Sequence, residues 1–297
     1  MSRCVVAASI GTAKDDAARR ALATLTNGPS RAAIILMVLG VLWAGIAQAA
    51  FDQRHESWDA LLKKSVVTAP SGVSSAVRYA SLKAGHDALR EYLASLSAVS
   101  PQEYSRWSRA DQLAFLINAY NAYTIELVLS RYPELKSIKD LGSLLQSPWK
   151  KRFFRLLGSE RSLDDLEHGL IRAPGAFDEP RIHFVLVCAS VGCPMLRDEA
   201  LVGTHLDTQL DDSMRRFLSD RTRNRFDGAS DTLAVSKIFD WYYADFEPGK
   251  NREDALKVFF ARHADVLGSS ANEQVKIRSG RYKIVYLDYD WSLNDSQ

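Results

Sequence analysis

The chain has 297 residues, of which 46% are hydrophobic and 25% are charged, and both proportions are ordinary for a globular protein. Its formal net charge is +2, so the overall charge does not favour nucleic acid or an acidic ligand as the partner. The length allows one large domain or two small ones, with a substantial buried core.

Residues 1–49 have the pattern of a leader that ends in a secretory signal peptide. Arg31 precedes an apolar run at residues 32–46, and Ala47-Gln48-Ala49 supplies the small-x-small pattern of a signal-peptidase site. The run is shorter than the ~20 residues of a membrane span, so we predict cleavage rather than an uncleaved anchor. The mature protein should start at Ala50, lie in the periplasm or outside the cell, and have no stable membrane span.

Removal of the leader changes both the charge and the cysteine content. It leaves 33 basic and 34 acidic side chains, so the mature chain is close to neutral. Of the three cysteines only Cys188 and Cys193 remain. Two cysteines are too few for a fold built on disulfides, although in an oxidising compartment this pair can form one.

The first part of the mature chain is predicted to be helical. Apolar residues recur at helical spacing from residue 58 to residue 96, and a Pro-Ser-Gly turn at residues 70–72 interrupts them. A short helix should follow, because Ser100 can cap it, Pro101 suits its first turn and Glu103 stands where a capping box needs an acid.

Residues 109–131 give the strongest helix prediction, since the segment is apolar nearly all round and therefore belongs in a core. Asn118 and Asn121 lie three residues apart, on one face of this helix. A buried amide needs hydrogen-bond partners, so we expect something polar to pack against that face. Pro133 closes the helix.

The following segments complete an α+β pattern. An aromatic and basic patch at residues 149–155 is interpreted as a solvated face, and no nucleic acid partner is predicted. Ser162 caps a helix that covers residues 163–172. Two more helices are predicted over residues 207–218 and 252–264, and strands over residues 181–188, 232–235 and 281–290. We therefore predict one helix-rich α+β domain with a small sheet over residues 50–297.

The most informative stretch is residues 180–196. A run of β-forming residues at 182–187 ends in a loop of small residues that carries both remaining cysteines, and His183 stands at its entry. A strand followed by such a loop holds a reactive side chain at the edge of a rigid sheet. Histidine with thiol is the pairing that nucleophilic thiol chemistry and soft-metal binding both use.

Several segments in order resemble the family called domain of unknown function 547, or DUF547. They are LAFLINAYN at 113–121, LEH at 166–168, RIHFVLVC at 181–188 with CP at 193–194, LAVSKIFDWY at 233–242 with DF at 245–246, and YDWSLN at 289–294. The commonest family sequence has Trp at Leu116 and a second Pro at Met195, and neither departure touches a candidate reactive atom. The resemblance implies no agreed activity, and the family's plant members carry coiled-coil extensions and look like interaction proteins.

Our first hypothesis is a Cys/His-dependent hydrolase or acyl-transferase that acts on a peptide or amide, with a logic similar to that of papain or transglutaminase by analogy alone. Such an enzyme needs a thiolate, an imidazole base and a group that orients the imidazole. The site should lie where the helix of the two asparagines meets the stretch 183–193. The candidates are Asn118, Asn121, Glu167, His168, His183, Cys188, Cys193 and Asp240.

The strand prediction bears on which cysteine would react. In a strand, His183 and Cys188 point to opposite faces, because they are separated by an odd number of residues. Cys193, on the loop, escapes this objection, and as a nucleophile it should be partly exposed. The structural alternative is that Cys188 is a small buried hydrophobe and His183 a core histidine bonded to the backbone.

Two other functions stay open. Glu167, His168 and His183 could bind zinc with the two cysteines, although the cysteine spacing is wider than in structural zinc sites. On a helix, the adjacent Glu167 and His168 would also project about 100° apart. The other alternative is a non-catalytic interaction module that uses the aromatic residues at 241–246. A protein or peptide partner is expected, and no cofactor is assigned.

Overall fold

A computed structural model describes residues 50–143 and 146–296, and the residues from Phe51 onward form one compact unit. The predicted leader and signal-peptidase site lie outside the described residues. In the part that is described, we find no helix with the length and apolar character needed to cross a membrane.

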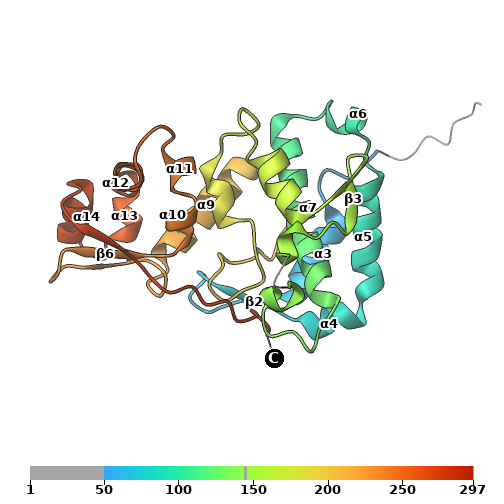
Figure 1. The fold of residues 1–297 in the computed structure, drawn as a ribbon, viewed down its shortest axis with the longest axis horizontal. Coiled ribbons are helices and arrows are strands. Elements are labelled where there is room, and N and C mark those ends of the chain that lie inside the picture. Colours follow the sequence, from blue (N-terminus) through green and yellow to red (C-terminus); the bar gives the residue numbers. More distant parts are fainter. Residues whose placement is uncertain (1–49, 144–145, 297) are drawn as a thin grey trace, which may run out of the picture. The chain divides into compact units, whose positions relative to one another are not determined.

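A buried helix, α7 (Arg109–Leu129), organises the N-terminal half of this unit, as the sequence predicted (Figure 1). Its neighbours are α3 (Glu56–Ser65), α4 (Tyr79–Ala84) and α5 (His86–Ala98), which share one hydrophobic core with it. The predicted interruption near residue 70 is a hairpin of β1 (Val66–Thr68) and β2 (Ser75–Val77). The short helix α6 (Pro101–Tyr104) begins at Ser100, whose side chain accepts the amide of Glu103 as expected. The Glu103 carboxylate accepts the Phe51 amide at 3.0 Å instead of completing a capping box.

The chain then forms short elements that pack on α5 and on the helix that follows them. They are two 3-10 helices, η1 (Ile138–Leu141) and η2 (Pro148–Lys150), and a hairpin of β3 (Phe154–Leu156) and β4 (Ser159–Arg161). The predicted cap at Ser162 is confirmed, because its hydroxyl and Asp165 form a capping box at the start of α8 (Leu163–Leu166). The helix continues as a π-helical turn, η3 (Glu167–Ile171).

The predicted strand at residues 181–188 is wrong. Pro180–Phe184 is a 3-10 helix (η4), and the residues after it belong to no strand. A short apolar run cannot be assigned to strand or buried helix by periodicity alone, and this run is buried on all sides. Its members divide between the two hydrophobic cores of the unit, since Val185 packs into the N-terminal core and Phe184 into the C-terminal one.

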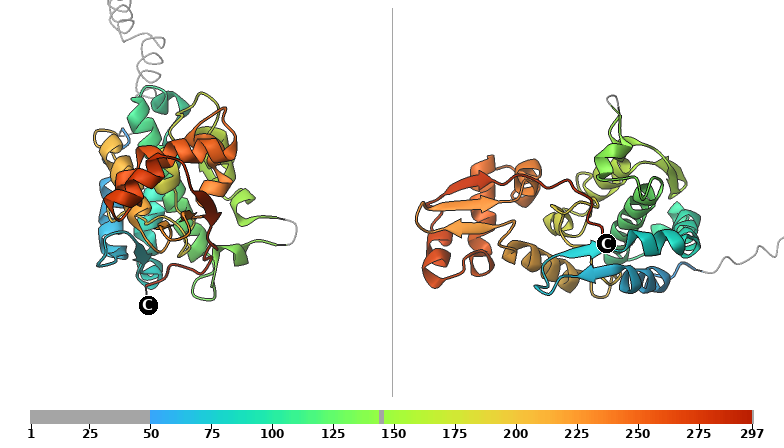
Figure 2. Two further views of the ribbon diagram at one scale, coloured as in Figure 1. Left: turned by 90° about the vertical axis from the view of Figure 1, so that its left-hand side faces the viewer. Right: turned by 90° about the horizontal axis from the view of Figure 1, so that it is seen from below.

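The C-terminal part contains a three-stranded sheet that includes both remaining predicted strands. β6 (Thr232–Val235) pairs antiparallel with β5 (Arg225–Asp227) and parallel with β7 (Lys283–Tyr286). A parallel pair needs a long crossover connection. Here five helices supply it, and the last three gather beside the sheet (Figure 2). The five are α10 (Ile238–Trp241), α11 (Tyr243–Phe246), α12 (Arg252–Arg262), α13 (Ala264–Leu267) and α14 (Ala271–Arg278). The predicted helix at 207–218 is α9 (Leu206–Ser219), and the helix-rich α+β class is confirmed.

After β7 the chain runs back to β2 as an extended tail over residues 287–296 (Figure 1). On the way it binds the cysteine loop, because Gly192 N–H donates to the Asp290 carbonyl at 2.8 Å and Asn294 N–H donates to the Ala189 carbonyl at 3.1 Å. The approach at Gly192 is close enough to require glycine, since a Cβ there would lie 2.9 Å from the Asp290 carbonyl oxygen. The tail therefore holds the loop in place.

Candidate functional site

A cavity of about 320 Å³ lies where α7, the π-helical turn, the cysteine loop, α10 and the tail meet. This volume is at the lower end of the ~300–1,000 Å³ of small-molecule sites. Aromatic rings make up much of its wall. The lining residues are Tyr120, Ser147, Trp149, Asp164, Glu167, His168, His183, Leu186, Cys188, Cys193, Pro194, Ile238, Trp241, Tyr242, Tyr289 and Trp291.

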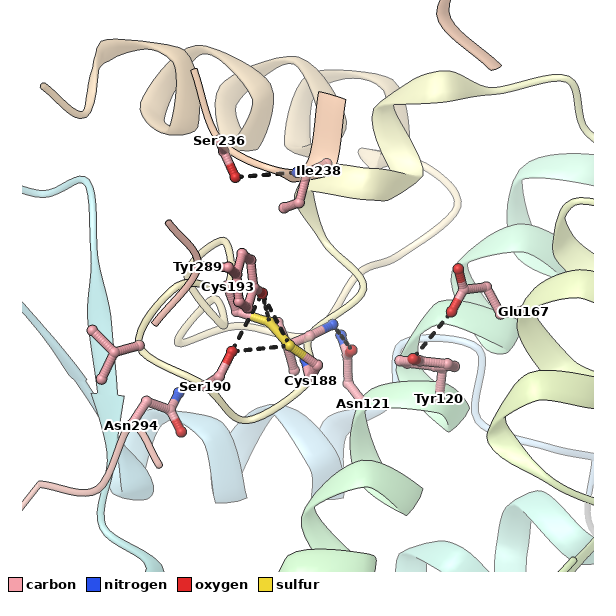
Figure 3. Close-up of a disulfide and its surroundings, with 12 residues drawn as sticks. Tyr120, Asn121, Glu167, Cys188, Ser190, Cys193, Ser236, Ile238, Tyr289 and Asn294 are labelled. Carbon is pink, nitrogen blue, oxygen red and sulfur yellow. Dashed lines mark hydrogen bonds between the residues drawn. A yellow bond between two sulfur atoms is a disulfide. The ribbon is translucent and has the colours of Figure 1, made fainter. Parts of the chain in front are cut away.

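The two cysteines form a disulfide that borders the cavity (Figure 3). Cys193 is buried, with 4% of its surface exposed, whereas Cys188 is half-buried. The expectation that Cys193 would be partly exposed is therefore wrong. The predicted loop is present, but the tail packs over it, and that contact could not be read from the local sequence.

Hydroxyl groups surround the disulfide. The Tyr289 hydroxyl lies 3.1 Å from Cys188 Sγ and 3.3 Å from Cys193 Sγ, and the Ser190 hydroxyl lies 3.1 Å from Cys188 Sγ (Figure 3). Burial raises the pKa of Tyr289 to about 12, so this phenol keeps its proton at neutral pH. It can therefore donate a hydrogen bond to sulfur, and donors of this kind stabilise a thiolate once the cysteines are reduced.

His183 comes from η4 and is almost completely buried. Its ring stacks on Tyr242 with 4.0 Å between centroids, and its Nε2 lies 2.7 Å from Asp245 Oδ2. Burial lowers the pKa of His183, although Asp245 opposes this effect. We therefore assign a neutral imidazole whose Nε2–H donates to Asp245. In this tautomer Nδ1 is unprotonated and can accept a proton.

Asp245 is held in turn by Arg172, at the end of the π-helical turn. The guanidinium donates to both carboxylate oxygens, at 2.6 and 3.0 Å. Partial burial acts to raise the pKa of Asp245, but the hydrogen bonds from His183 and Arg172 outweigh it and hold that pKa well below its usual range. The carboxylate therefore stays ionised and orients the imidazole.

The π-helical turn brings two adjacent side chains to the same cavity. Glu167 is buried and accepts the Tyr120 hydroxyl at 3.2 Å (Figure 3), whereas His168 is exposed and binds Arg172 Nη1 through Nδ1 at 2.6 Å. Burial, followed by the charge of Glu167, raises the pKa of Tyr120 and of Tyr242. The extra residue of a π turn changes the direction of the side chains, and such turns are frequent at functional sites.

Asn118 and Asn121 are buried as predicted, but they do not orient a histidine. Asn121 Nδ2 donates to the Val185 carbonyl at 2.9 Å, and its Oδ1 accepts the Val187 amide at 3.0 Å. Asn118 makes the same two kinds of bond to the carbonyl and amide of Leu201. Both amides therefore bind backbone, and neither lines the cavity.

The remaining candidates are placed as follows. Asp240 pairs with Lys237 and Arg252, away from the cavity. No group of three or more His, Cys, Asp and Glu side chains within residues 50–143 and 146–296 is arranged to hold a metal ion, and the two cysteines bond to each other. The zinc alternative therefore has no support.

Sequence reasoning missed the carboxylate that does bind His183. Asp245 belongs to one of the motifs that resemble DUF547, but nothing local in the sequence links it to His183, 62 residues earlier. Arg172, the residue that holds Asp245, stands four residues after His168. This spacing places the two side chains on one helical face, so the sequence did contain a signal that Arg172 lies near the site. Tyr289 reaches the disulfide only through the tail.

Comparison with known proteins agrees with the sequence motifs. Residues 104–218 match the family model described as protein of unknown function, DUF547. The matched segment is 115 of the 297 residues, so the similarity to DUF547 covers this segment and not the whole chain. This region supplies the cavity wall from Tyr120 to Pro194, whereas Asp245, Tyr289 and the tryptophans 241 and 291 lie beyond it. Searches of curated proteins and of solved structures found no match.

Proposed function

We propose that this protein is a thiol-dependent acyl-transfer enzyme, a hydrolase or acyl-transferase that acts on an amide or peptide. One observation carries the proposal: a cysteine pair and a histidine held by a carboxylate border the same cavity. A nucleophile, a base and a group that orients the base are the parts that such chemistry needs.

Cys188 is the better nucleophile of the two. It is the more exposed cysteine, and a nucleophile must touch its substrate. The hydroxyls of Tyr289 and Ser190 both lie 3.1 Å from its sulfur, where they can stabilise a thiolate. Cys193, which is buried, is then the partner that forms the disulfide.

The disulfide must be reduced before the thiol can react. A thiol reductant supplies two electrons and two protons, and its own two thiols become a disulfide. Cys188 then gives its proton to Nδ1 of His183, and the thiolate attacks the carbonyl carbon of the substrate. The carbon–nitrogen bond breaks as the imidazolium returns the proton to the leaving amine. Water, or another acceptor, attacks the resulting thioester while His183 takes its proton, and Cys188 is released.

Thiol alkylation tests this proposal. The oxidised protein that starts at Ala50 should not react with iodoacetamide, because its only two cysteines form the disulfide. After reduction and removal of the reductant, peptide mapping by mass spectrometry should find Cys188 labelled faster than Cys193, already at pH 6. An imidazolium nearby lowers the thiol pKa from its free value of ~8.5, so His183→Gln should slow the reaction at pH 6 and not at pH 9.

A matched histidine gives the control. His168→Gln removes a second imidazole that lines the cavity, and we expect it to leave the labelling rate unchanged. If His183→Gln does not fold, the pH profile of the wild-type protein decides alone. Labelling that rises only near pH 8.5 would contradict the enzyme proposal and favour a non-catalytic module that binds a protein or peptide in this cavity.

We also propose that the protein is exported, because residues 31–49 have the pattern of a cleaved signal. An oxidising compartment would keep the disulfide formed in the resting protein. N-terminal sequencing of the processed protein should give Ala50, and a cytoplasmic product that starts at Met1 would contradict export.

A further inference from the structure

The cavity combines aromatic walls with two carboxylates and two histidines, and His168 Nε2 lies 3.8 Å from Asp164 Oδ1. Asp164 and Glu167 line it, and no lysine or arginine does so among the residues that the structure describes. His183 is neutral, since burial lowers its pKa. A ligand that enters this space therefore meets two acidic side chains and the faces of electron-rich rings.

The cationic side chains closest to the cavity wall, Arg172 and Lys139, already contact other groups of the protein. Arg172 lies behind Tyr242, 4.8 Å from the ring centroid; it pairs with Asp245 and also interacts electrostatically with Glu167. Lys139 lies 3.7 Å from the centroid of Trp291, so one face of this ring already carries an ammonium group from the protein itself.

The aromatic wall continues to the surface. Trp241 is 45% exposed, and its ring centroid lies 4.9 Å from that of Tyr289 and 5.7 Å from that of Trp291. A large exposed aromatic residue at the edge of a cavity is typical of a binding site. At the inner end, Glu167 is held by the Tyr120 hydroxyl, so its carboxylate is fixed before any ligand arrives.

We propose that this cavity binds an alkylammonium group, with Glu167 as the counter-ion and Trp241, Tyr289 and Trp291 as the aromatic wall. Aromatic rings with a carboxylate recognise organic cations by the attraction between the cation and the ring face. A neutral sugar fits less well, because no asparagine or glutamine lines the described cavity to share its hydroxyls. Binding of an alkylammonium group does not depend on the proposed thiol chemistry. Only the further step of calling this ligand the enzyme's substrate rests on the proposed function.

Binding can be tested without any thiol chemistry, on the oxidised protein. Fluorescence of the wall tryptophans at pH 7 should be quenched saturably by N-acetyl-lysine-methylamide. The norleucine analogue, which lacks only the ammonium group, should bind at least about tenfold more weakly, the effect of a partly desolvated cation–π contact. Pentylamine forms a second arm, and the tighter of the two amines identifies whether the natural ammonium group belongs to a peptide or to a free amine.

Variants locate the site. Glu167→Gln keeps the shape of the side chain and should weaken the lysine compound about tenfold while leaving the norleucine compound unchanged. Trp241→Leu, at a partly exposed position, should weaken both amines, and an unchanged unfolding midpoint would show that the variant keeps its fold. The matched control is Glu253→Gln, which removes the same charge from an exposed pair with Lys257 far from the cavity, and should have no effect.

Three results would overturn the proposal: equal binding of the norleucine compound, tighter binding of a neutral sugar such as glucose, or equal losses for Glu167→Gln and Glu253→Gln. The two proposals are tested on different states of the protein. Binding is measured on the oxidised protein, in which Cys188 and Cys193 are bonded to each other, whereas alkylation is measured after reduction, so either proposal can fail while the other stands.

Discussion

Asn121 supplies to Val185 and Val187 the two hydrogen bonds that a neighbouring strand would otherwise make. A side-chain amide has one donor and one acceptor group in the same arrangement as a peptide unit, so it can pair with backbone in this way. The sequence suggested a strand at these residues because they are apolar and β-forming. The structure shows that their polar backbone atoms are satisfied by a helix instead.

Substitution of Asn121 should test this role. Asn121→Leu leaves a buried carbonyl and a buried amide without partners, which should cost on the order of 1–3 kcal/mol of unfolding free energy. The measurement is the midpoint of denaturant unfolding. Thr124→Val is the control on the same helix, because the Thr124 hydroxyl is buried without a hydrogen-bond partner and its loss should cost nothing. An unchanged midpoint for Asn121→Leu would refute the assigned role.

At the scale of elements, the cysteine loop depends on the tail that packs over it. Val191 N–H donates to the Ser292 carbonyl and Gly192 N–H to the Asp290 carbonyl, both at 2.8 Å. The same tail carries Tyr289 to the disulfide. The site is therefore assembled from two segments about a hundred residues apart, and neither would hold its position alone.

Gly192→Ala should push the tail away from the cysteine loop. The added methyl group would lie 3.0 Å or less from the backbone of Asp290, so the tail must move, at a cost of about 1–3 kcal/mol. We expect a lower unfolding midpoint and faster reduction of the disulfide by dithiothreitol, measured by thiol release. Gly228→Ala, where the methyl group meets nothing within 4 Å, is the control and should match wild type. The interpretation fails if both variants reduce at the wild-type rate.

At the scale of the whole molecule, buried histidines link stability to pH. Burial lowers the pKa of His55 to about 4, and it also lowers the pKa values of His183 and His263. In the unfolded chain each has a pKa of ~6.5. Below that pH the unfolded state therefore binds more protons than the folded state, and stability falls as the pH falls.

Between pH 7 and pH 5, His55 alone should contribute a loss on the order of 2 kcal/mol. Denaturant unfolding at several pH values measures the slope, which His55→Gln should flatten. His205→Gln, at an exposed histidine, should leave the slope unchanged. A wild-type midpoint that stays constant over this range would show that these histidines are accessible to water.

The sequence by itself determined the elements whose signals are local. The buried helix α7 follows from its apolar composition, the helix starts at Ser100 and Ser162 from their capping residues, and β6 from its β-forming run. The motifs also indicated the family whose model matches residues 104–218, and they located the histidine and cysteines that border one cavity. These features depend on residues that are close together in the chain, or on sequence similarity.

Only the tertiary structure decided what surrounds those residues. It replaced the strand at 181–188 with a 3-10 helix at Pro180–Phe184 and a following segment that Asn121 binds, because burial between two cores overrides local propensity. It assigned the orienting carboxylate to Asp245, 62 residues from His183, and brought Tyr289 to the sulfur atoms from 101 residues away. Such contacts depend on how distant segments pack, and no local pattern encodes which of several acids or tyrosines will arrive.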